Sequence, residues 1–305
     1  MKLTKKKKHK GLPKLNEFSK IFFSWQTKLE TEGQRRGLGS GGNFRKVFKK
    51  TIETILKLDR NRQKILFMMR PSFKEKVRIA TEAFFTEFKN IKMKDTLYLD
   101  TRPGLLGLFT AVDGIVLTTT GDLEYQSIKI DRSGIYKILK KLKSSIGKPN
   151  MYMQFLLSRN KEAQMPQYLN EFMTHSKSSS ITVFIYDDNP EKFKYANQYL
   201  LEWEKEQELS ADKFYVWIKR GRVADNMTSE KEQSIINSSP PFKMVENIAQ
   251  FISFIKQKKR DNYKSIVFLD FDGALSDNRI MRFRQAKVAY KHAINLLNYN
   301  PEDKS

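Results

Sequence analysis

The pattern of hydrophobic and polar positions changes at about residue 95. Before it, apolar residues such as Phe18, Phe22 and Leu29 recur at helical spacing, which predicts helices over 13–30, 44–58 and 72–91. After it, short apolar runs alternate with amphipathic stretches. The runs predict strands at 96–99, 105–112, 151–157, 181–186, 214–218 and 265–269. The stretches between them predict helices at 133–142, 165–173, 190–206 and 242–259.

Alternation of strands and helices is typical of an α/β fold with a mostly parallel sheet covered by helices on both sides. We therefore expect the strands that end near Val112, Leu157, Tyr186 and Leu269 to lie in one sheet. Five glycines fall within residues 31–43 and predict a flexible loop. The expected organisation is a basic tail, helix and glycine-rich loop over 1–43, a basic helical region over 44–94, and the α/β domain over 95–305.

Charge is concentrated in the first quarter of the chain. The formal net charge is +23, and residues 1–80 carry +17 of it. Excess positive charge beside interleaved aromatic residues favours contact with a nucleic-acid backbone, although a solvated face or a nuclear import signal would have a similar composition. The candidate nucleic-acid-binding residues are Lys5, Lys6, Lys7, Lys8, Lys10, Arg35, Arg36, Arg45, Lys46, Lys49, Lys50, Arg60, Arg62 and Lys64.

The lack of cysteine and of long apolar runs excludes several classes of protein. The chain has no cysteine, which excludes disulfides, thiol nucleophiles and cysteine-ligated metals. It also has no apolar run of the roughly 18–20 residues that span a bilayer, and no apolar signal core near Met1. We therefore expect an intracellular protein without membrane insertion.

Acidic residues follow two of the predicted strands. The run 265–269 ends in Asp270-Phe271-Asp272-Gly273, and the run 181–186 ends in Asp187-Asp188. Ligands of parallel α/β sheets bind at the carboxyl ends of the strands. These acids therefore mark the place where chemistry is expected, and paired carboxylates there are suited to Mg²⁺.

These motifs resemble those of the haloacid dehalogenase-like (HAD) phosphohydrolases, including variants associated with RNA repair. The resemblance covers roughly residues 105–205 and 265–278. It implies that Asp270 attacks phosphorus and that Asp272 protonates the leaving group, with Asp270, Asp187 and Asp188 around Mg²⁺. Ser158, after the strand at 151–157, resembles the phosphate-binding residue of the second motif. Lys219 stands where a phosphate-binding lysine of this family could lie.

The order of the motifs departs from that of the family, because the strand with the nucleophile comes last instead of first. The expected place of the first motif reads Phe109-Thr110-Ala111-Val112-Asp113, with Ala111 at the position of the nucleophile. Three alternatives follow. A circularly permuted sheet brings Asp270 to the active centre, or residues 105–205 form a degenerate HAD fold without chemistry. In the third, 270–273 is a simple strand-to-helix turn with Asp272 or Ser276 as a helix cap.

The methyl group of Ala111 favours the degenerate fold, in which Asp270 and Asp188 lie too far apart to share a metal. We therefore expect an RNA-associated structural protein of a large ribonucleoprotein, without catalytic residues, metal or cofactor. A mitochondrial ribosome subunit fits this description. The mitochondrial matrix is then the first expected location, ahead of nucleus, nucleolus or cytoplasm. The expected partners are RNA, ribosomal RNA above all, and neighbouring proteins. The alternative is a Mg²⁺-dependent HAD-type phosphohydrolase that acts on nucleic-acid or small phosphate esters.

Overall fold

The computed structural model describes residues 13–35, 44–58, 71–91, 93–121, 123–148, 150–158 and 160–297. The chain forms two compact units. The helical unit holds α1 (Leu15–Arg35), α2 (Phe44–Leu58), α4 (Pro71–Lys89) and the part of α13 (Asn278–Leu297) that follows Met281. The sheet unit is Lys92–Met281. None of the described helices is both long and apolar enough to cross a membrane.

Phenylalanine rings form the core of the helical unit. Phe48 on α2 stacks on Phe84 of α4 with ring centroids 5.0 Å apart, and Phe22 of α1 meets Phe84 edge-on at 6.2 Å. All three side chains are fully buried. Each aromatic pair contributes about 0.5–1.5 kcal/mol beyond the area that it buries. The three predicted helices of this region are confirmed.

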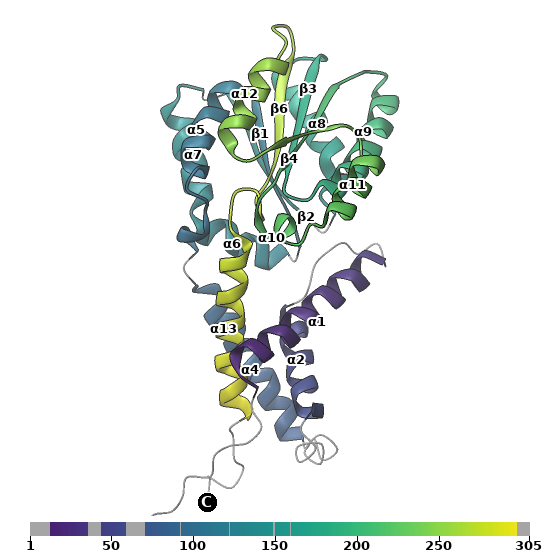
Figure 1. Ribbon diagram of the computed structural model, residues 1–305. Coiled ribbons are helices and arrows are strands. Elements are labelled where there is room, and N and C mark those ends of the chain that lie inside the picture. Colours follow the sequence, from purple (N-terminus) through teal and green to yellow (C-terminus); the bar gives the residue numbers. More distant parts are fainter. Residues whose placement is uncertain are drawn as a thin grey trace, which may run out of the picture. The chain divides into compact units, whose positions relative to one another are not determined.

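The sheet unit is built on six parallel strands in the order β2-β1-β6-β3-β4-β5. Figure 1 shows the sheet with helices packed around it. This confirms the predicted α/β fold. The strands are β1 (Gly114–Thr120), β2 (Tyr152–Ser158), β3 (Ile181–Asp187), β4 (Asp212–Ile218), β5 (Phe242–Val245) and β6 (Lys264–Asp270). The last strand in the chain therefore lies inside the sheet, between the first and the third.

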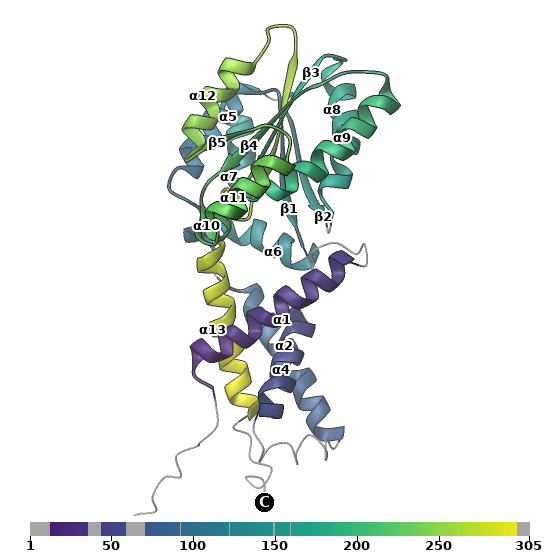
Figure 2. The same ribbon diagram turned by 45° about the vertical axis from the view of Figure 1, so that its right-hand side comes forward.

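Helices cover both faces of this sheet (Figures 1 and 2). On one face, α5 (Thr101–Ala111), α7 (Ile135–Ser145) and α12 (Ile248–Lys258) bury side chains such as Leu108, Leu139 and Phe251. On the other face, α8 (Met165–Ser176) and α9 (Phe193–Gln207) bury Phe172 and Trp203. The other helical elements described in this unit are η1 (Lys94–Thr96), α6 (Leu123–Ser133), η2 (Glu162–Gln164), η3 (Pro190–Lys192), α10 (Gly221–Asp225) and α11 (Ser229–Ser238).

Three predictions of secondary structure are wrong. Residues 96–99 comprise the end of η1, an isolated bridge between Leu97 and Ser276, and the start of a turn, and 105–112 lies almost wholly in helix α5. The predicted helix 242–259 is strand β5 followed by α12. Strand β1 was not predicted at all. The strands ending near Leu157, Tyr186 and Leu269 do share one parallel sheet, whereas Val112 ends a helix.

Helix α5 resembles a strand in sequence because Gly104 and Gly107 interrupt its helical pattern. A β-carbon at Gly104 would lie 2.5 Å from Cγ2 of Ile248, and one at Gly107 would lie 2.5 Å from Cδ1 of Ile252. Glycine lowers the intrinsic helix propensity by about 1 kcal/mol. Here it is required because α5 packs closely against α12, so a tertiary contact overrides the local preference.

Candidate active site

The central position of β6 places its carboxyl end beside that of β3. Leu269 is the register partner of Tyr186, so Asp270 and Asp187 leave the sheet as neighbours. One carboxylate oxygen from each of Asp187, Asp188 and Asp270 lies within 4.8 Å of the other two. The expectation that Asp270 and Asp188 lie too far apart to share a metal is therefore wrong. The chain order separates the two strands, but the sheet topology makes them adjacent.

Burial dominates the electrostatics of these acids. Asp187, Asp188 and Asp270 are each at most 5 % exposed. Burial, and the charges of Asp187 and Asp270, raise the pKa of Asp188 well above its ordinary value. Burial also raises the pKa of Asp270, against the opposing charge of Lys161. Such a cluster of desolvated carboxylates is typical of a functional site.

Lys161 lies in the middle of the acid cluster. Its Nζ is 2.6 Å from Oδ2 of Asp187 and 2.5 Å from Oδ1 of Asp270, and its side chain is 4 % exposed. Burial alone would lower the pKa of Lys161, but the charges of Asp187 and Asp270 outweigh it and hold the pKa well above its ordinary value. The ammonium group thus offsets part of the negative charge.

The turn after β6 is shaped by Gly273. Its φ of +82° is unfavourable for residues with a β-carbon, and a β-carbon there would lie 1.8 Å from Oδ2 of Asp188. The backbone of the turn therefore lies directly against an acid of the cluster. Arg220 holds the next residue, because its Nε donates to the carbonyl of Ala274 at 2.9 Å.

Asp272 is held by one of its two oxygens. Its Oδ2 accepts hydrogen bonds from the buried ammonium of Lys129 on α6 and, at 3.0 Å, from the hydroxyl of Thr119 on β1. Its Oδ1 is buried and, among the described residues, has no hydrogen-bond partner. The second acid of the motif is therefore fixed in orientation, with one free oxygen.

Two residues named from the sequence are not brought into the acid cluster. Ser158 ends the edge strand β2, which β1 separates from β6, and its hydroxyl accepts from the amide of Asn160 at 3.1 Å. The ammonium group of Lys219 pairs with Glu232 on α11 at 3.0 Å. Ala111 belongs to helix α5 and not to the end of a strand, so it does not stand at the position of a nucleophile.

Three observations bear on the order of the motifs. Ala111 lies in helix α5, so its methyl group gives no support to a degenerate fold. Asp272 bonds Lys129 and Thr119, and the hydroxyl of Ser276 donates to the carbonyl of Phe271 at 3.2 Å, so these contacts are not those of helix caps. Asp270 ends a central strand of the sheet, beside Asp187.

The donor set fits a hard divalent cation. Two oxygens bound to one octahedral Mg²⁺ lie about 2.9 Å apart when adjacent and about 4.2 Å apart when opposite, close to the span of the three carboxylates. Oδ2 of Asp188 is buried and has no hydrogen-bond partner among the described residues. An unpartnered carboxylate oxygen beside two other acids is costly unless a cation compensates it. Asp187, Asp188 and Asp270 would hold that cation.

Most of the candidate nucleic-acid-binding residues lie outside the described residues, namely Lys5, Lys6, Lys7, Lys8, Lys10, Arg36, Arg60, Arg62 and Lys64. Arg35 is the last residue of α1. Of those on α2, Arg45 pairs with Glu82 at 3.0 Å and Lys50 with Glu53 at 2.9 Å. Lys46 and Lys49 lie on the same helix, and both are exposed.

Sequence reasoning missed Lys161, Lys129 and Thr119. Lys161 follows the end of β2 by three residues, and Lys129 lies on α6. In the sequence, both are indistinguishable from ordinary surface lysines. The signal that could have found Lys161 is its place just beyond a strand whose sheet carries acids at the same edge. Finding Lys129 and Thr119 required the prediction of β1, whose Thr118 is the register partner of Asp270.

Comparison with known proteins gives no further information about this site. No family model, no curated protein and no solved structure matches the chain.

Proposed function

We propose that the chain is a Mg²⁺-dependent phosphohydrolase of the HAD type, with Asp270 as its nucleophile. The observation that carries this proposal is the convergence of Asp270, Asp187 and Asp188 within 4.8 Å at the carboxyl edge of the sheet. It departs from the expectation of a non-catalytic protein, which depended on Ala111 as the residue at the position of the nucleophile. The HAD-like assignment itself rests on the motifs and on their agreement with this arrangement.

The first step is attack on phosphorus. A carboxylate oxygen of Asp270 forms a bond to phosphorus while the bond from phosphorus to the leaving oxygen breaks. The ammonium of Lys161 keeps Asp270 in place and offsets charge. Bound Mg²⁺ would supply further positive charge for the phosphoryl oxygens. The product of this step is an aspartyl phosphate on Asp270 and the free leaving group.

Asp272 is placed to move the proton. Lys129 and Thr119 hold its Oδ2, so Oδ1 is the atom that gives a proton to the leaving oxygen. In the second step a water molecule attacks phosphorus, the bond to Asp270 breaks, and Oδ1 takes the proton of that water. Phosphate leaves, and both carboxylates return to their starting state.

Strand β1 offers a donor for the phosphoryl oxygens. Thr120 follows Thr118, the register partner of Asp270, by two residues. Its hydroxyl is buried and, in the described part of the chain, makes no hydrogen bond. A buried hydroxyl without a partner carries a free-energy cost. We propose that a phosphate oxygen accepts from it, the role that the sequence assigned to Ser158.

The test is turnover of p-nitrophenyl phosphate by the full chain with Mg²⁺. We expect release of p-nitrophenol that EDTA stops and that Asp270→Asn abolishes. The matched control is Asp131→Asn on α6, whose carboxylate is 70 % exposed, and it should keep full turnover. Turnover that survives Asp270→Asn would contradict the proposal, as would the absence of turnover in all three proteins with several aryl and alkyl phosphates.

We further propose nucleic acid as the ligand of the helical unit, as the charge of residues 1–80 indicates. The supporting observation is the surroundings of Trp25 on α1, since the ammonium of Lys28 lies 4.9 Å and that of Lys50 lies 5.9 Å from its ring. A ring flanked by cations suits a stacked base beside its phosphates. A ribonucleoprotein such as the mitochondrial ribosome stays a prediction from charge alone.

A further inference from the structure

The edge strand β2 has a row of backbone groups that point away from the sheet. The amide of Tyr152 donates to the carbonyl of Asp113, and the carbonyl of Ser158 accepts from the amide of Gly121. Because neighbouring residues of a strand point their backbone groups to opposite sides, the even-numbered residues of β2 face β1. The groups of Met153, Phe155 and Leu157 therefore face outward.

Most of these outward-facing amides and carbonyls have no hydrogen-bond partner among the described residues. The hydroxyl of Tyr168 on α8 donates to the carbonyl of Phe155 at 3.2 Å. No other strand of the described chain pairs with this side of β2, so the amides of all three residues and two of the carbonyls are available to an added strand.

The sequence of β2 does not protect this edge. Exposed edge strands are usually short, charged, bulged or interrupted by proline, because an open edge recruits other chains. The opposite edge of the sheet follows that rule, since β5 has four residues and includes Lys243. In contrast, β2 has seven residues, none of them charged and none proline. An edge of this kind is expected to be covered by a partner.

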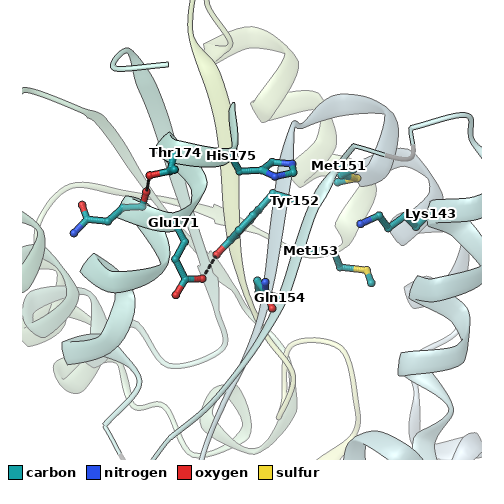
Figure 3. A pocket seen from close by; sticks show the side chains of 9 residues that line it. Lys143, Met151, Tyr152, Met153, Gln154, Glu171, Thr174 and His175 are labelled. Carbon is teal, nitrogen blue, oxygen red and sulfur yellow. Dashed lines mark hydrogen bonds between the residues drawn. The ribbon is translucent and has the colours of Figure 1, made fainter. Parts of the chain in front are cut away.

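A groove lies along the first half of this edge. It has a volume of about 600 Å³ and is lined by β2 from Met151 to Gln154, by Lys143 of α7, and by Asn170, Glu171, Thr174 and His175 of α8. Figure 3 shows Lys143 on one side of Met153 and Glu171 on the other side of the strand, where Glu171 accepts from the hydroxyl of Tyr152. Hence an added strand would lie between two helices.

The helix α7 determines the charge of that partner. Its eleven residues contain Lys137, Lys140, Lys141 and Lys143 and no acid, and no salt bridge engages these four lysines in the described chain. Tyr136, which packs on Phe155 at 5.3 Å, shares a helical face with Lys140 and Lys143. That face therefore runs beside the open edge and presents two ammonium groups to it.

We propose that β2 binds an extended acidic segment of a partner protein by strand addition. The added strand would bond the backbone of Met153 and Leu157 and the amide of Phe155. Its alternate side chains on the α7 side would be carboxylates that meet Lys140 and Lys143. The lysine-rich residues 1–12 of this chain have the wrong charge for that place. The inference is independent of the phosphohydrolase proposal, because the groove contains none of the acids of the active site.

The probe is a fluorescein-labelled peptide of alternating valine and glutamate, titrated into the full chain. We expect binding that Lys140→Glu with Lys143→Glu weakens about tenfold. The matched control, Lys137→Glu with Lys141→Glu, makes the same charge change on the same helix but away from the face of Tyr136, and it should alter affinity less than about twofold. A valine–lysine peptide and an acidic peptide with a central proline should bind at least tenfold more weakly, since the proline lacks an amide donor.

Hydrogen exchange tests the strand pairing directly. With the acidic peptide bound, exchange at the amides of Met153, Phe155 and Leu157 should slow, while the amides of Gln154 and Leu156, which already face β1, should change little. Equal weakening by both pairs of substitutions would overturn the proposal, as would binding without protection of these three amides. Protection of the same amides in the free chain that disappears on dilution would assign the edge to a second copy and would also overturn it.

Discussion

Gly273 and Asp188 are in direct contact across the turn that follows β6. A β-carbon at Gly273 would lie 1.8 Å from Oδ2 of Asp188 and 2.4 Å from its Cγ. The carboxylate of Asp188 therefore occupies the space that a β-carbon at position 273 would need. Glycine at this position is a requirement of the acid cluster as well as of the positive φ.

We therefore predict that Gly273→Ala disrupts the site. Its φ of +82° and the clash with Asp188 should together cost about 2–4 kcal/mol of unfolding free energy and abolish Mg²⁺-dependent turnover. The control is Gly147→Ala, where φ is +66° but nothing lies within 4 Å of the added carbon. It should lose about 1 kcal/mol and retain turnover. Equal effects of the two substitutions in urea unfolding would show that the contact with Asp188 is unimportant.

The buried oxygen of Asp188 predicts a conflict between stability and metal binding. Asp188→Asn removes a carboxyl group whose ionised form is disfavoured by burial and by the charges of Asp187 and Asp270, so the metal-free protein should melt a few degrees higher than the wild type. Mg²⁺ should raise the melting temperature of the wild type and leave that of the variant unchanged. The measurement is thermal melting with and without Mg²⁺ at a millimolar concentration. A metal-dependent shift in the variant as large as in the wild type would exclude Asp188 as a ligand.

Lys161 is predicted to stabilise the fold as well as to support the chemistry. Lys161→Met keeps an unbranched side chain, one atom shorter, but leaves the buried carboxylates of Asp187 and Asp270 without their cation. Loss of one member of a buried ion pair costs about 3–5 kcal/mol. Urea unfolding in the absence of Mg²⁺ measures this loss. Added Mg²⁺ should recover part of it, and a variant as stable as the wild type would contradict the compensation of charge described above.

Asp113 is expected to make stability depend on acid pH. Burial raises the pKa of Asp113, but hydrogen bonds from the amide and hydroxyl of Ser265, both 3.0 Å long, and the charge of Lys259 outweigh it, so the pKa is lowered. A carboxyl with a lowered pKa in the folded state stabilises the protein above the unfolded value of about 3.9, and this stability is lost as the pH falls through the folded value.

Asp113→Asn should therefore reduce the unfolding free energy by about 1 kcal/mol at neutral pH, and the difference from the wild type should shrink below about pH 4. Asp131→Asn, at a carboxylate that is 70 % exposed, is the control. Denaturant unfolding at a series of pH values measures both. A difference for Asp113→Asn that stays constant far into the acid range would contradict this account.

Binding of nucleic acid by the helical unit is testable without deletion of its buried phenylalanines. Lys46→Gln with Lys49→Gln on α2 should reduce the steepness of log affinity against log salt by about 0.7–0.9 for each phosphate that these lysines neutralise. The control is Lys256→Gln with Lys258→Gln on α12 of the sheet unit. Fluorescence anisotropy with a single-stranded RNA measures the slope, and the same slope for both pairs would argue against α2 as a binding surface.

The sequence alone was sufficient to predict the fold class and to single out Asp187, Asp188 and Asp270. It was not sufficient to predict how these acids are arranged in space. Strands β3, β4 and β6 were found because valine, isoleucine and phenylalanine form isolated runs there. In contrast, α5 and β1 form one nearly continuous apolar stretch in sequence, and the glycines packed against Ile248 and Ile252 removed the helical signal that would have divided it.

The wrong prediction of a strand at 105–112 also led to a wrong prediction of the site. With 105–112 taken as a strand, Ala111 stood at the position of the nucleophile, and β1 was not available as the neighbour of β6. The adjacency of Asp270 and Asp187 depends on the order of strands in the sheet, which hydrophobic periodicity does not contain. Lys161 was invisible for a similar reason, because its partners are 26 and 109 residues away in the chain.

The place of β6 in the chain has a consequence for synthesis of the protein. Its pairing with β1 joins residues about 150 positions apart, and such distant pairings form slowly. While β6 is still inside the ribosome, β1 and β3 each present an open apolar edge where their shared neighbour belongs. The nascent chain therefore stays prone to aggregation until its final strand emerges. Chaperone binding should be prolonged on it, and premature termination before Lys264 should give insoluble fragments rather than a partly folded domain.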